Sequence, residues 1–497
     1  MFLPRFLLPL VALVTAAALP AASLQEQVSA FVAQPRFEGA IWGVQVISLD
    51  SGRVLAEHQP RVRQSPASNA KLYVGALALA RLGGDYRIRT PLLATAALQP
   101  DGVLPGDLVV SGRGDPSWGA REKQPEFWSA FAPFVDALRR AGVKHIRGDL
   151  VADGTWLRCL PAGESWTVDD MHHDYGAEVS GITVFDNFVE LRVTPGAHEG
   201  EPCAFEVLEP HSGLTFVNRT TTLKPGAPAS VETRRIFATT TVEVVGGVAA
   251  DAKTGKAEAP VPRPARWFAL CLKAALERAG IKVDGAARSA IWPESAVPAP
   301  VTLGQIESPP LRELVAGFMK PSQNLETDLV FSHAGELRRD ATTPADRRSD
   351  QLAVTGLDAF LREAGVGANQ VIFDEGSGLS RNNLTTPEAT VRLLQFMARH
   401  AEARAFRDSL PIAGRDGSLQ KRLRGTPAEN NVVAKTGGLR WSATLSGYAT
   451  TAAGEPVVFS LMLNRHVSAE GRRASDEIDA LAAMIAGSGR ETAPASK

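Results

Sequence analysis

The sequence predicts an α/β protein in which one domain is built from both ends of the chain and is split by a long β-rich insertion. Patterns typical of both strands and helices occupy residues 24–90 and return from residue 301 to residue 486. Residues 91–300 instead carry short alternating strands between Gly- and Pro-containing turns. We therefore expect a discontinuous terminal domain around an inserted region that has room for two nested subdomains.

Length and composition are those of an ordinary globular protein of two or three domains. The chain has 497 residues, of which 44% are hydrophobic and 22% charged, so it can bury a large core without disulfides or metals. The formal net charge of -1 does not indicate nucleic acid or an anionic membrane as a partner.

The first 23 residues form a segment of their own. Arg5 is the only charged residue before Glu26, and an apolar run at residues 6–19 is followed by small residues. This order is typical of a signal peptide. Because the apolar run is shorter than the roughly 20 residues of a spanning helix, we favour a removed signal at residues 1–23 over a stable membrane anchor. We expect the mature protein in the periplasm or another extracytoplasmic space, with a disordered tail at residues 487–497.

The elements of the terminal domain begin with strands at residues 40–47 and 53–57, around the turn Asp50-Ser51-Gly52. A helix follows with Leu72 and Leu79 on one face, and Gly83-Gly84 end it. Later come helices at residues 311–319, 325–337 and 345–364, strands at residues 432–435, 443–449 and 457–463, and a final helix with Ser475 as its N-cap. The insertion should contain strands at residues 106–110, 148–151 and 189–193 and helices at residues 127–140 and 266–279.

Cysteine and histidine positions do not indicate a metal site. Because an oxidising compartment permits a disulfide, Cys159 and Cys203 are the better candidates for a pair, and Cys271 is expected as a buried thiol within a helix. No Cys/His spacing suggests zinc, and His172-His173-Asp174 is interpreted as a solvated loop. Asp374 and Glu375 receive no acid–base role because sequence neighbours rarely point together; residues 374–383 are expected to shape a loop near the cleft.

The first motif that could carry chemistry is Ser68-Asn69-Ala70-Lys71, at the start of the first helix. Residues i and i+3 share a helix face, so the Lys71 amine can reach the Ser68 hydroxyl. A serine becomes a nucleophile when a base takes its proton, and lysine serves as that base only when neutral. By itself, however, this pattern is more often a capped helix with an exposed lysine.

Two further triplets are also common when taken alone. Ser322-Gln323-Asn324 lies between two expected helices, where it could cap a helix or pass a proton and orient a lysine. Lys435-Thr436-Gly437 ends an apolar run, where lysine and hydroxyl can bind a carboxylate and glycine permits a close approach of substrate.

Together, the three motifs resemble the set shared by penicillin-binding proteins and class A β-lactamases, in order and in context. The long spacing between the first two is similar to that of low-molecular-mass class C penicillin-binding proteins, the D-alanyl-D-alanine carboxypeptidase/endopeptidase family of penicillin-binding protein 4. Further similar stretches are GRGDPS (112–117), DEGSGLSRNNL (374–384), LPIAGRDGSL (410–419) and AKTGGL (434–439).

This resemblance implies a serine β-lactamase/transpeptidase-like domain, an antiparallel sheet flanked by helices. It implies a serine D-Ala-D-Ala carboxypeptidase, a D,D-endopeptidase or both, acting on peptidoglycan stem peptides and cross-links. It also implies covalent inhibition by penicillins and other β-lactams, and no metal or organic cofactor.

The same resemblance assigns roles to residues. Ser68 is the nucleophile, Lys71 the general base, and Ser322 and Asn324 complete the proton relay and substrate clamp. Backbone N–H groups of Ser68 and Gly438 form the oxyanion hole. Lys435 and Thr436 are expected to bind the terminal carboxylate of the substrate, and Gly437 and Gly438 to contact the substrate on the same strand.

Two positions depart from the family pattern. Gly438 stands where Thr or Ser is common, and Gln323 replaces a more frequent acidic residue. Gly438 keeps its backbone N–H but lacks a hydroxyl, which leaves β-lactam sensitivity open. The rival functions are a slow or idle peptidoglycan-binding or assembly protein, against which the intact Ser68, Lys71 and Lys435 argue, and a β-lactamase or esterase on the same scaffold.

Overall fold

The computed structural model describes residues 22–119 and 126–489. Residues 1–21 of the expected signal peptide and residues 490–497 of the expected tail lie outside the described residues. None of the described helices is both long enough and apolar enough to cross a membrane.

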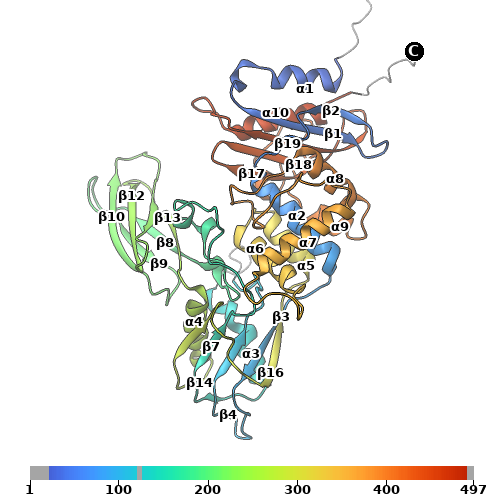
Figure 1. The fold of residues 1–497 in the computed structure, drawn as a ribbon. Helices are drawn as coiled ribbons and strands as arrows, with labels where there is room; N and C mark the ends of the chain where they lie inside the picture. Colours follow the sequence, from blue (N-terminus) through green and yellow to red (C-terminus); the bar gives the residue numbers. More distant parts are fainter. Residues whose placement is uncertain (1–21, 120–125, 490–497) are drawn as a thin grey trace, which may run out of the picture.

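A five-stranded antiparallel sheet joins the two ends of the chain (Figure 1). Its order is β17-β18-β19-β1-β2, so the N-terminal hairpin meets the C-terminal strands where β1 pairs with β19. Ile41 lies opposite Asn464 in this pairing. The strands are β1 Ile41–Ser48, β2 Val54–His58, β17 Val433–Leu439, β18 Ser442–Thr450 and β19 Pro456–Asn464.

Helices cover both faces of this sheet (Figure 1), which is why β1, β18 and β19 are buried almost continuously. On one face, α1 (Leu24–Val32) and α10 (Ala474–Ala486) share an apolar core with the strands. On the other face, α2 (Ala70–Leu82) and α8 (Pro387–Ala398) belong to a second core. The remaining helices of this layer are α5 Leu311–Met319, α6 Asn324–Glu336, α7 Ser349–Glu363 and α9 Ala403–Ser409.

The inserted region leaves and rejoins the terminal domain through two paired strands. β3 (Arg89–Ala94) and β16 (Val301–Glu307) pair antiparallel within the sheet β15-β7-β5-β3-β16. The expected boundaries near residues 90 and 301 therefore fall at the starts of these strands, and β16 belongs to the inserted sheet. Helices α3 (Ala132–Arg140) and α4 (Pro264–Arg278) pack against it in one apolar core.

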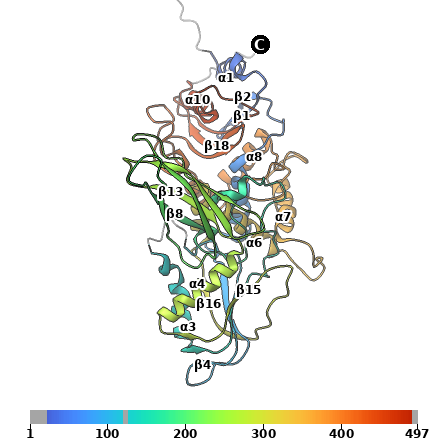
Figure 2. The ribbon, with the colours of Figure 1, turned by 90° about the vertical axis from the view of Figure 1, so that its left-hand side faces the viewer.

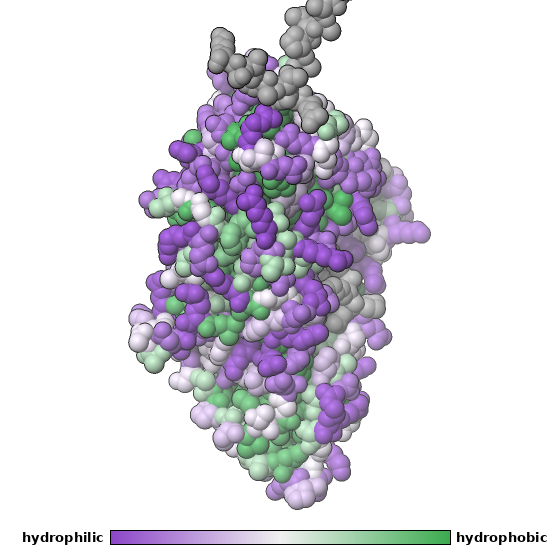
Figure 3. Space-filling model, turned by 90° about the vertical axis from the view of Figure 1, so that its right-hand side faces the viewer, coloured by the Kyte–Doolittle hydropathy of each residue, from purple (hydrophilic) through white to green (hydrophobic). Residues whose placement is uncertain are grey.

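Three smaller sheets complete the insertion, in the orders β10-β12-β11, β13-β8-β9 and β14-β6-β4. Figure 2 shows β8 and β13 beside the terminal domain, with β4 at the far end of the molecule. Hydrophilic side chains cover most of the face in Figure 3, and apolar ones gather toward the end that carries β4. The strands are β4 Val103–Leu104, β5 Leu108–Ser111, β6 His145–Ile146, β7 Leu150–Asp153, β8 Phe188–Thr194, β9 Ala204–Val207, β10 Thr215–Leu223, β11 Glu232–Arg235, β12 Thr241–Ala249, β13 Gly255–Pro260, β14 Lys282–Val283 and β15 Ala287–Ala290.

Two sequence predictions about local structure are wrong. The first residue of α10 is Ala474, so Ser475 lies inside its first turn and is not the N-cap. The expected Cys159–Cys203 disulfide is absent, because both thiols are free. Cys203 is buried against Thr222 within the inserted region, whereas Cys159 packs beside the apolar cluster that includes Leu325 on α6.

Candidate active site

Ser68 and Lys71 lie where the chain turns into α2. A short 3-10 turn, Ala67–Asn69, precedes the helix, and Ala67 has a positive φ of 47°. A non-glycine residue in that region is strained, and such strain persists only where the surroundings hold it. The turn places Lys71 Nζ 3.0 Å from Ser68 Oγ.

The Lys71 amine is fully buried, and its polar neighbours fix its direction. It donates to Asn324 Oδ1 and to the Ser377 carbonyl oxygen, each at 2.6 Å, besides its contact with Ser68. Burial lowers the pKa of Lys71 to about 8, against the opposing attraction of Asp328 and Glu375. Because the two carbonyl oxygens can only accept, they take both N–H groups of the neutral amine and leave its lone pair for the Ser68 hydroxyl.

The second motif brings Ser322 to the other side of the site. Ser322 follows α5 and has a positive φ of 73°, the second strained non-glycine residue here. Its Oγ accepts a hydrogen bond of 2.8 Å from Lys435 Nζ, which also donates to the Thr436 carbonyl oxygen. Lys435 is fully buried, and burial, together with the nearby Lys71 charge, holds its pKa well below the ordinary value.

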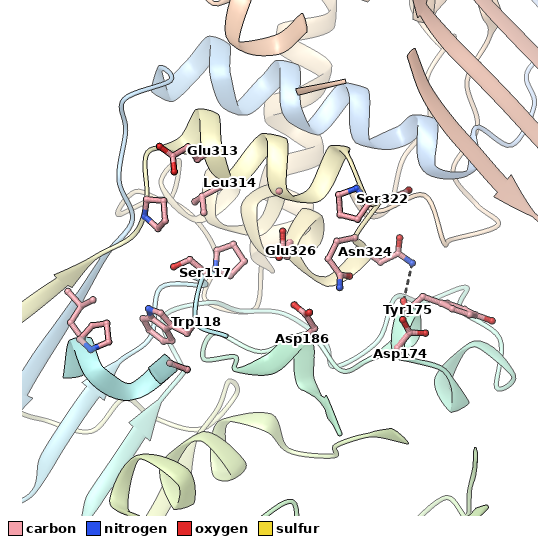
Figure 4. Close-up of a pocket in the computed structure, with 18 of the residues that line it drawn as sticks. Ser117, Trp118, Asp174, Tyr175, Asp186, Glu313, Leu314, Ser322, Asn324 and Glu326 are labelled. Atoms are coloured by element: carbon pink, nitrogen blue, oxygen red, sulfur yellow. Dashed lines mark hydrogen bonds between the residues drawn. The ribbon is translucent and has the colours of Figure 1, made fainter. Parts of the chain in front are cut away.

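Asn324 connects the motifs to the inserted region. It is the first residue of α6, a helix whose residues are all buried. While its Oδ1 accepts from Lys71, its Nδ2 donates to the Tyr175 carbonyl oxygen at 3.0 Å (Figure 4). The asparagine therefore fixes the lysine and one wall of the site at the same time.

The third motif lies on β17, an edge strand of the sheet. Ala434 N–H donates to the Pro411 carbonyl oxygen on the edge away from β18. In an antiparallel strand, alternate residues turn both backbone groups to the same edge, so those of Thr436 and Gly438 also face that edge. Beyond the bridge between Ile412 and Val433, no described strand pairs with it.

Glycines set how closely β17 approaches the serine. A Cβ on Gly437 would lie 3.0 Å from Ser68 N and 2.7 Å from the Pro66 carbonyl oxygen. A Cβ on Gly438 would meet nothing within 4 Å. The first glycine is therefore needed for the contact, whereas the second leaves open space where a side chain would fit.

Hydroxyl groups converge beside Lys435 on the same strand. Thr436 Oγ1 lies 2.6 Å from Ser418 Oγ. With the lysine amine, they form a hydroxyl-lined end of the strand edge whose hydrogen-bond donors suit a carboxylate. The family-like stretch at residues 410–419 contains Ser418, but the sequence did not assign this serine a role.

Two buried carboxylates lie behind Lys71, and sequence reasoning missed both. Asp328, on α6, accepts from the backbone N–H groups of Gly376 and Ser377 through Oδ1. Glu375 accepts from Ser377, Gly378, Ser380 and Asn383. Both carboxylates therefore fix, through hydrogen bonds, the loop in which the Ser377 carbonyl oxygen accepts from Lys71. Burial raises the pKa of each carboxyl, that of Asp328 well above its ordinary range.

Hydrogen bonding distinguishes the two carboxylates. Glu375 has donors on both oxygens, which stabilise its ionised form. Asp328 Oδ2 is buried and finds no hydrogen-bond partner among the described residues. When the pair holds one proton, we expect that proton on Asp328 and the negative charge on Glu375. Glu375, which was expected to have no acid–base role, thus acts on the site through its charge beside Lys71.

A cavity of about 570 Å³ adjoins the site on the side of Ser322 and Asn324 (Figure 4). It lies between α5, the start of α6 and the inserted region, with Trp118 and Tyr175 on its wall, and does not include Ser68. Carboxylates line it at Asp174, Asp186, Glu307, Glu313 and Glu326.

Histidines of the insertion have structural partners. His172 Nδ1 accepts from the backbone N–H of Arg235 at 3.0 Å. Within residues 22–119 and 126–489, no group of three or more His, Cys, Asp or Glu side chains could hold a metal ion.

Comparison with known proteins agrees with this arrangement. The model of the D-Ala-D-Ala carboxypeptidase 3 (S13) family matches residues 24–485. The D-alanyl-D-alanine carboxypeptidase of Actinomadura sp. (strain R39) is 33% identical over 479 residues, which cover 93% of this chain and 85% of that protein. DacB of Haemophilus influenzae, a D-alanyl-D-alanine carboxypeptidase, is 25% identical over 86% of each chain.

The fold is shared with a solved structure. The crystal structure of penicillin binding protein 4 from Haemophilus influenzae superposes with a TM-score of 0.77 at 24% identity, covering 92% of this chain and 97% of that one. The predicted α/β fold of the transpeptidase kind is thereby confirmed.

Proposed function

The chain belongs to the D-Ala-D-Ala carboxypeptidase 3 (S13) family, and we propose on this premise that it hydrolyses D-alanyl peptide bonds of peptidoglycan through an acyl-enzyme on Ser68. The observation that carries the proposal is the 3.0 Å contact between Ser68 Oγ and a fully buried Lys71. Substrates are stem peptides ending in D-Ala-D-Ala, D-amino-acid cross-links or both, so the enzyme acts as a carboxypeptidase, a D,D-endopeptidase or both.

Acylation begins with neutral Lys71. Its lone pair takes the Ser68 proton while the serine oxygen attacks the carbonyl carbon of the penultimate D-alanine. The resulting oxyanion accepts hydrogen bonds from the backbone N–H groups of Ser68 and Gly438. The outward direction of the Gly438 backbone and the close approach at Gly437 support this assignment.

Breakdown of the tetrahedral intermediate needs a proton on the leaving amine. Ser322 Oγ donates this proton and receives another from the pair of Lys71 and Lys435, since it already accepts a hydrogen bond from Lys435 at 2.8 Å. Asn324 keeps Lys71 in place through both steps. The terminal carboxylate of the substrate binds at Lys435, Thr436 and Ser418, the hydroxyl-lined end of the strand edge.

Water then attacks the acyl-enzyme, with Lys71 again as base, and releases the shortened peptide. A penicillin acylates Ser68 in the same way, but its opened ring stays attached and no amine leaves. The substrate is outside the cytoplasm, which agrees with removal of residues 1–23 as a signal peptide and with a periplasmic or other extracytoplasmic location.

Intact-mass analysis after incubation with a penicillin tests the proposal. We expect one penicillin adduct on the wild type and none on Ser68→Ala. Ser65→Ala, which removes a neighbouring hydroxyl, is the matched control and should keep the adduct. Release of D-alanine from a D-Ala-D-Ala tripeptide should follow the same pattern. A folded wild type that forms no adduct and releases no D-alanine would refute the function and favour an idle peptidoglycan-binding protein.

A further inference from the structure

An exposed aromatic and cationic tip ends the hairpin that carries β17. β17 and β18 are joined by a two-residue turn, Arg440-Trp441, after the last pair of Leu439 with Ser442. Trp441 is 56% exposed, and the Arg440 guanidinium lies 4.6 Å from the centre of its ring. Val467, 76% exposed, follows His466, whose N–H donates to the Trp441 carbonyl oxygen.

Two arginines at and beside this tip form no ion pair within the described part of the chain. Arg440 and Arg465 are both exposed, and neither pairs with a carboxylate in the part of the chain that the structure describes. A large aromatic side chain is thus exposed to solvent beside two arginines that no carboxylate pairs. Such a combination is typical of surfaces that bind a partner.

The proposed function fixes what passes this tip. A substrate with its carboxylate at Thr436 and its scissile carbonyl at Gly438 runs antiparallel to β17, as an added strand does. Residues nearer to its amino end therefore extend past Leu439 toward Trp441. β17 ends at Leu439, one extended rise of about 3.4 Å beyond Gly438, and the turn Arg440-Trp441 lies directly past it.

The stem peptide has a defined chemistry at that distance. Counted back from the penultimate D-alanine at Gly438, the third stem residue lies opposite Leu439, and the second and first lie beyond the end of β17, at the turn Arg440-Trp441. In peptidoglycan, the second residue is an acidic residue linked through its side chain, and the first is joined to N-acetylmuramic acid. The free carboxylate of the second stem residue thus comes near the Arg440 guanidinium, and the muramoyl ring comes near the face of Trp441.

We propose that the tip, defined as Arg440, Trp441 and Val467, is a subsite for the sugar-bearing end of the stem. Arg440 pairs with the free carboxylate of the second residue, and Trp441 stacks on the muramoyl ring. This subsite rests on the proposed function. It adds to that function a preference of the enzyme for glycan-attached stems over free short peptides.

The test compares two substrates that share one scissile bond. The short one is an N-acylated tripeptide ending in D-Ala-D-Ala, which stops before Arg440. The long one is the N-acetylmuramoyl pentapeptide. For Trp441→Ala and Arg440→Ala, kcat/KM for D-alanine release from the long substrate should fall about fivefold, the scale of one aromatic contact. Turnover of the tripeptide should stay at the wild-type level.

Controls separate the subsite from the fold and from the chemistry. Trp441→Phe keeps an aromatic face and should restore most of the long-substrate activity. Val54→Ala removes an exposed apolar side chain from β2, the opposite edge of the sheet. It should leave kcat/KM for both substrates unchanged. Unchanged kcat/KM of the Trp441→Ala variant on the muramoyl pentapeptide, or equal losses on both substrates, would overturn the subsite while the function stands. A wild type inactive on both substrates would instead overturn the function.

Discussion

Replacing Glu375 by glutamine should shift the pH dependence of acylation to lower pH. The neutral form of Lys71 is the base, so the acylation rate follows the fraction of neutral lysine. With a pKa of about 8, roughly a tenth of Lys71 is neutral at pH 7 and about nine tenths at pH 9. The wild-type rate should therefore rise about tenfold across that interval.

Negative charge on the Asp328–Glu375 pair favours the protonated lysine and thus raises the Lys71 pKa; in our assignment of the shared proton, that charge is on Glu375. Removing that charge in Glu375→Gln should lower the pKa by about one unit, the lower end for a close charge pair. About half of the lysine is then neutral at pH 7, and the rate there should rise roughly fivefold. The plateau near pH 9 should hardly change, because the base is already neutral.

Asp328→Asn is the matched comparison. If the shared proton is on Asp328, asparagine replaces a group that is already uncharged, so the pH profile should stay close to that of the wild type. The assay is the second-order rate constant for acylation by a chromogenic cephalosporin between pH 6 and pH 9.5, with thermal unfolding recorded at each pH.

The reasoning would be refuted if Glu375→Gln left the apparent pKa unchanged or moved it upward. An equal downward shift in Asp328→Asn would show that the charge is on the other carboxylate. Loss of folding in either variant would appear in the thermal curve, separately from the pH profile.

Two further predictions follow from the glycines and from the thiols. Gly437→Ala should reduce the rate of acylation by more than tenfold, because its Cβ meets Ser68 N and the Pro66 carbonyl oxygen. Gly438→Ala places its Cβ in open space and should retain activity within about twofold. Equal effects of the two substitutions in the cephalosporin assay would contradict the geometry. Alkylation of the unreduced, denatured protein should add three alkyl groups by mass, one on each of Cys159, Cys203 and Cys271. A single added group would show that two of these cysteines form a disulfide.

Motif order and helix periodicity predicted much of the terminal domain. The helix expected at residues 311–319 coincides with α5, and the strands expected at residues 443–449 and 457–463 lie within β18 and β19. These segments carry strong apolar patterns, and packing against the sheet does not override them. The i, i+3 relation likewise placed Lys71 beside Ser68, because a helical turn is a local property.

Contacts between distant segments were not predictable in the same way. Ser377 holds Lys71 through a backbone carbonyl, a group that every residue has and that no side-chain pattern marks. Asp328 had a weak signal, since it lies four residues after Asn324 on one helix face. Glu375 was set aside together with Asp374 because sequence neighbours rarely point together; the structure buries only Glu375 of the two, and the sequence gives no sign of which one is buried. Cysteine pairing failed because spacing in sequence carries no information on Cβ distance.

The pairing of β1 with β19 has a consequence for biosynthesis. Ile41 finds Asn464 only after nearly the whole polypeptide has been made, and contacts of such long range form slowly. Strand β17, which supplies one side of the oxyanion hole in the proposed mechanism, is held in place by the strands that follow it. A chain still emerging from the ribosome or passing through an export channel therefore contains Ser68 without the sheet that would make it reactive. If residues 1–23 direct export, as proposed above, the complete hydrolase forms only after transport.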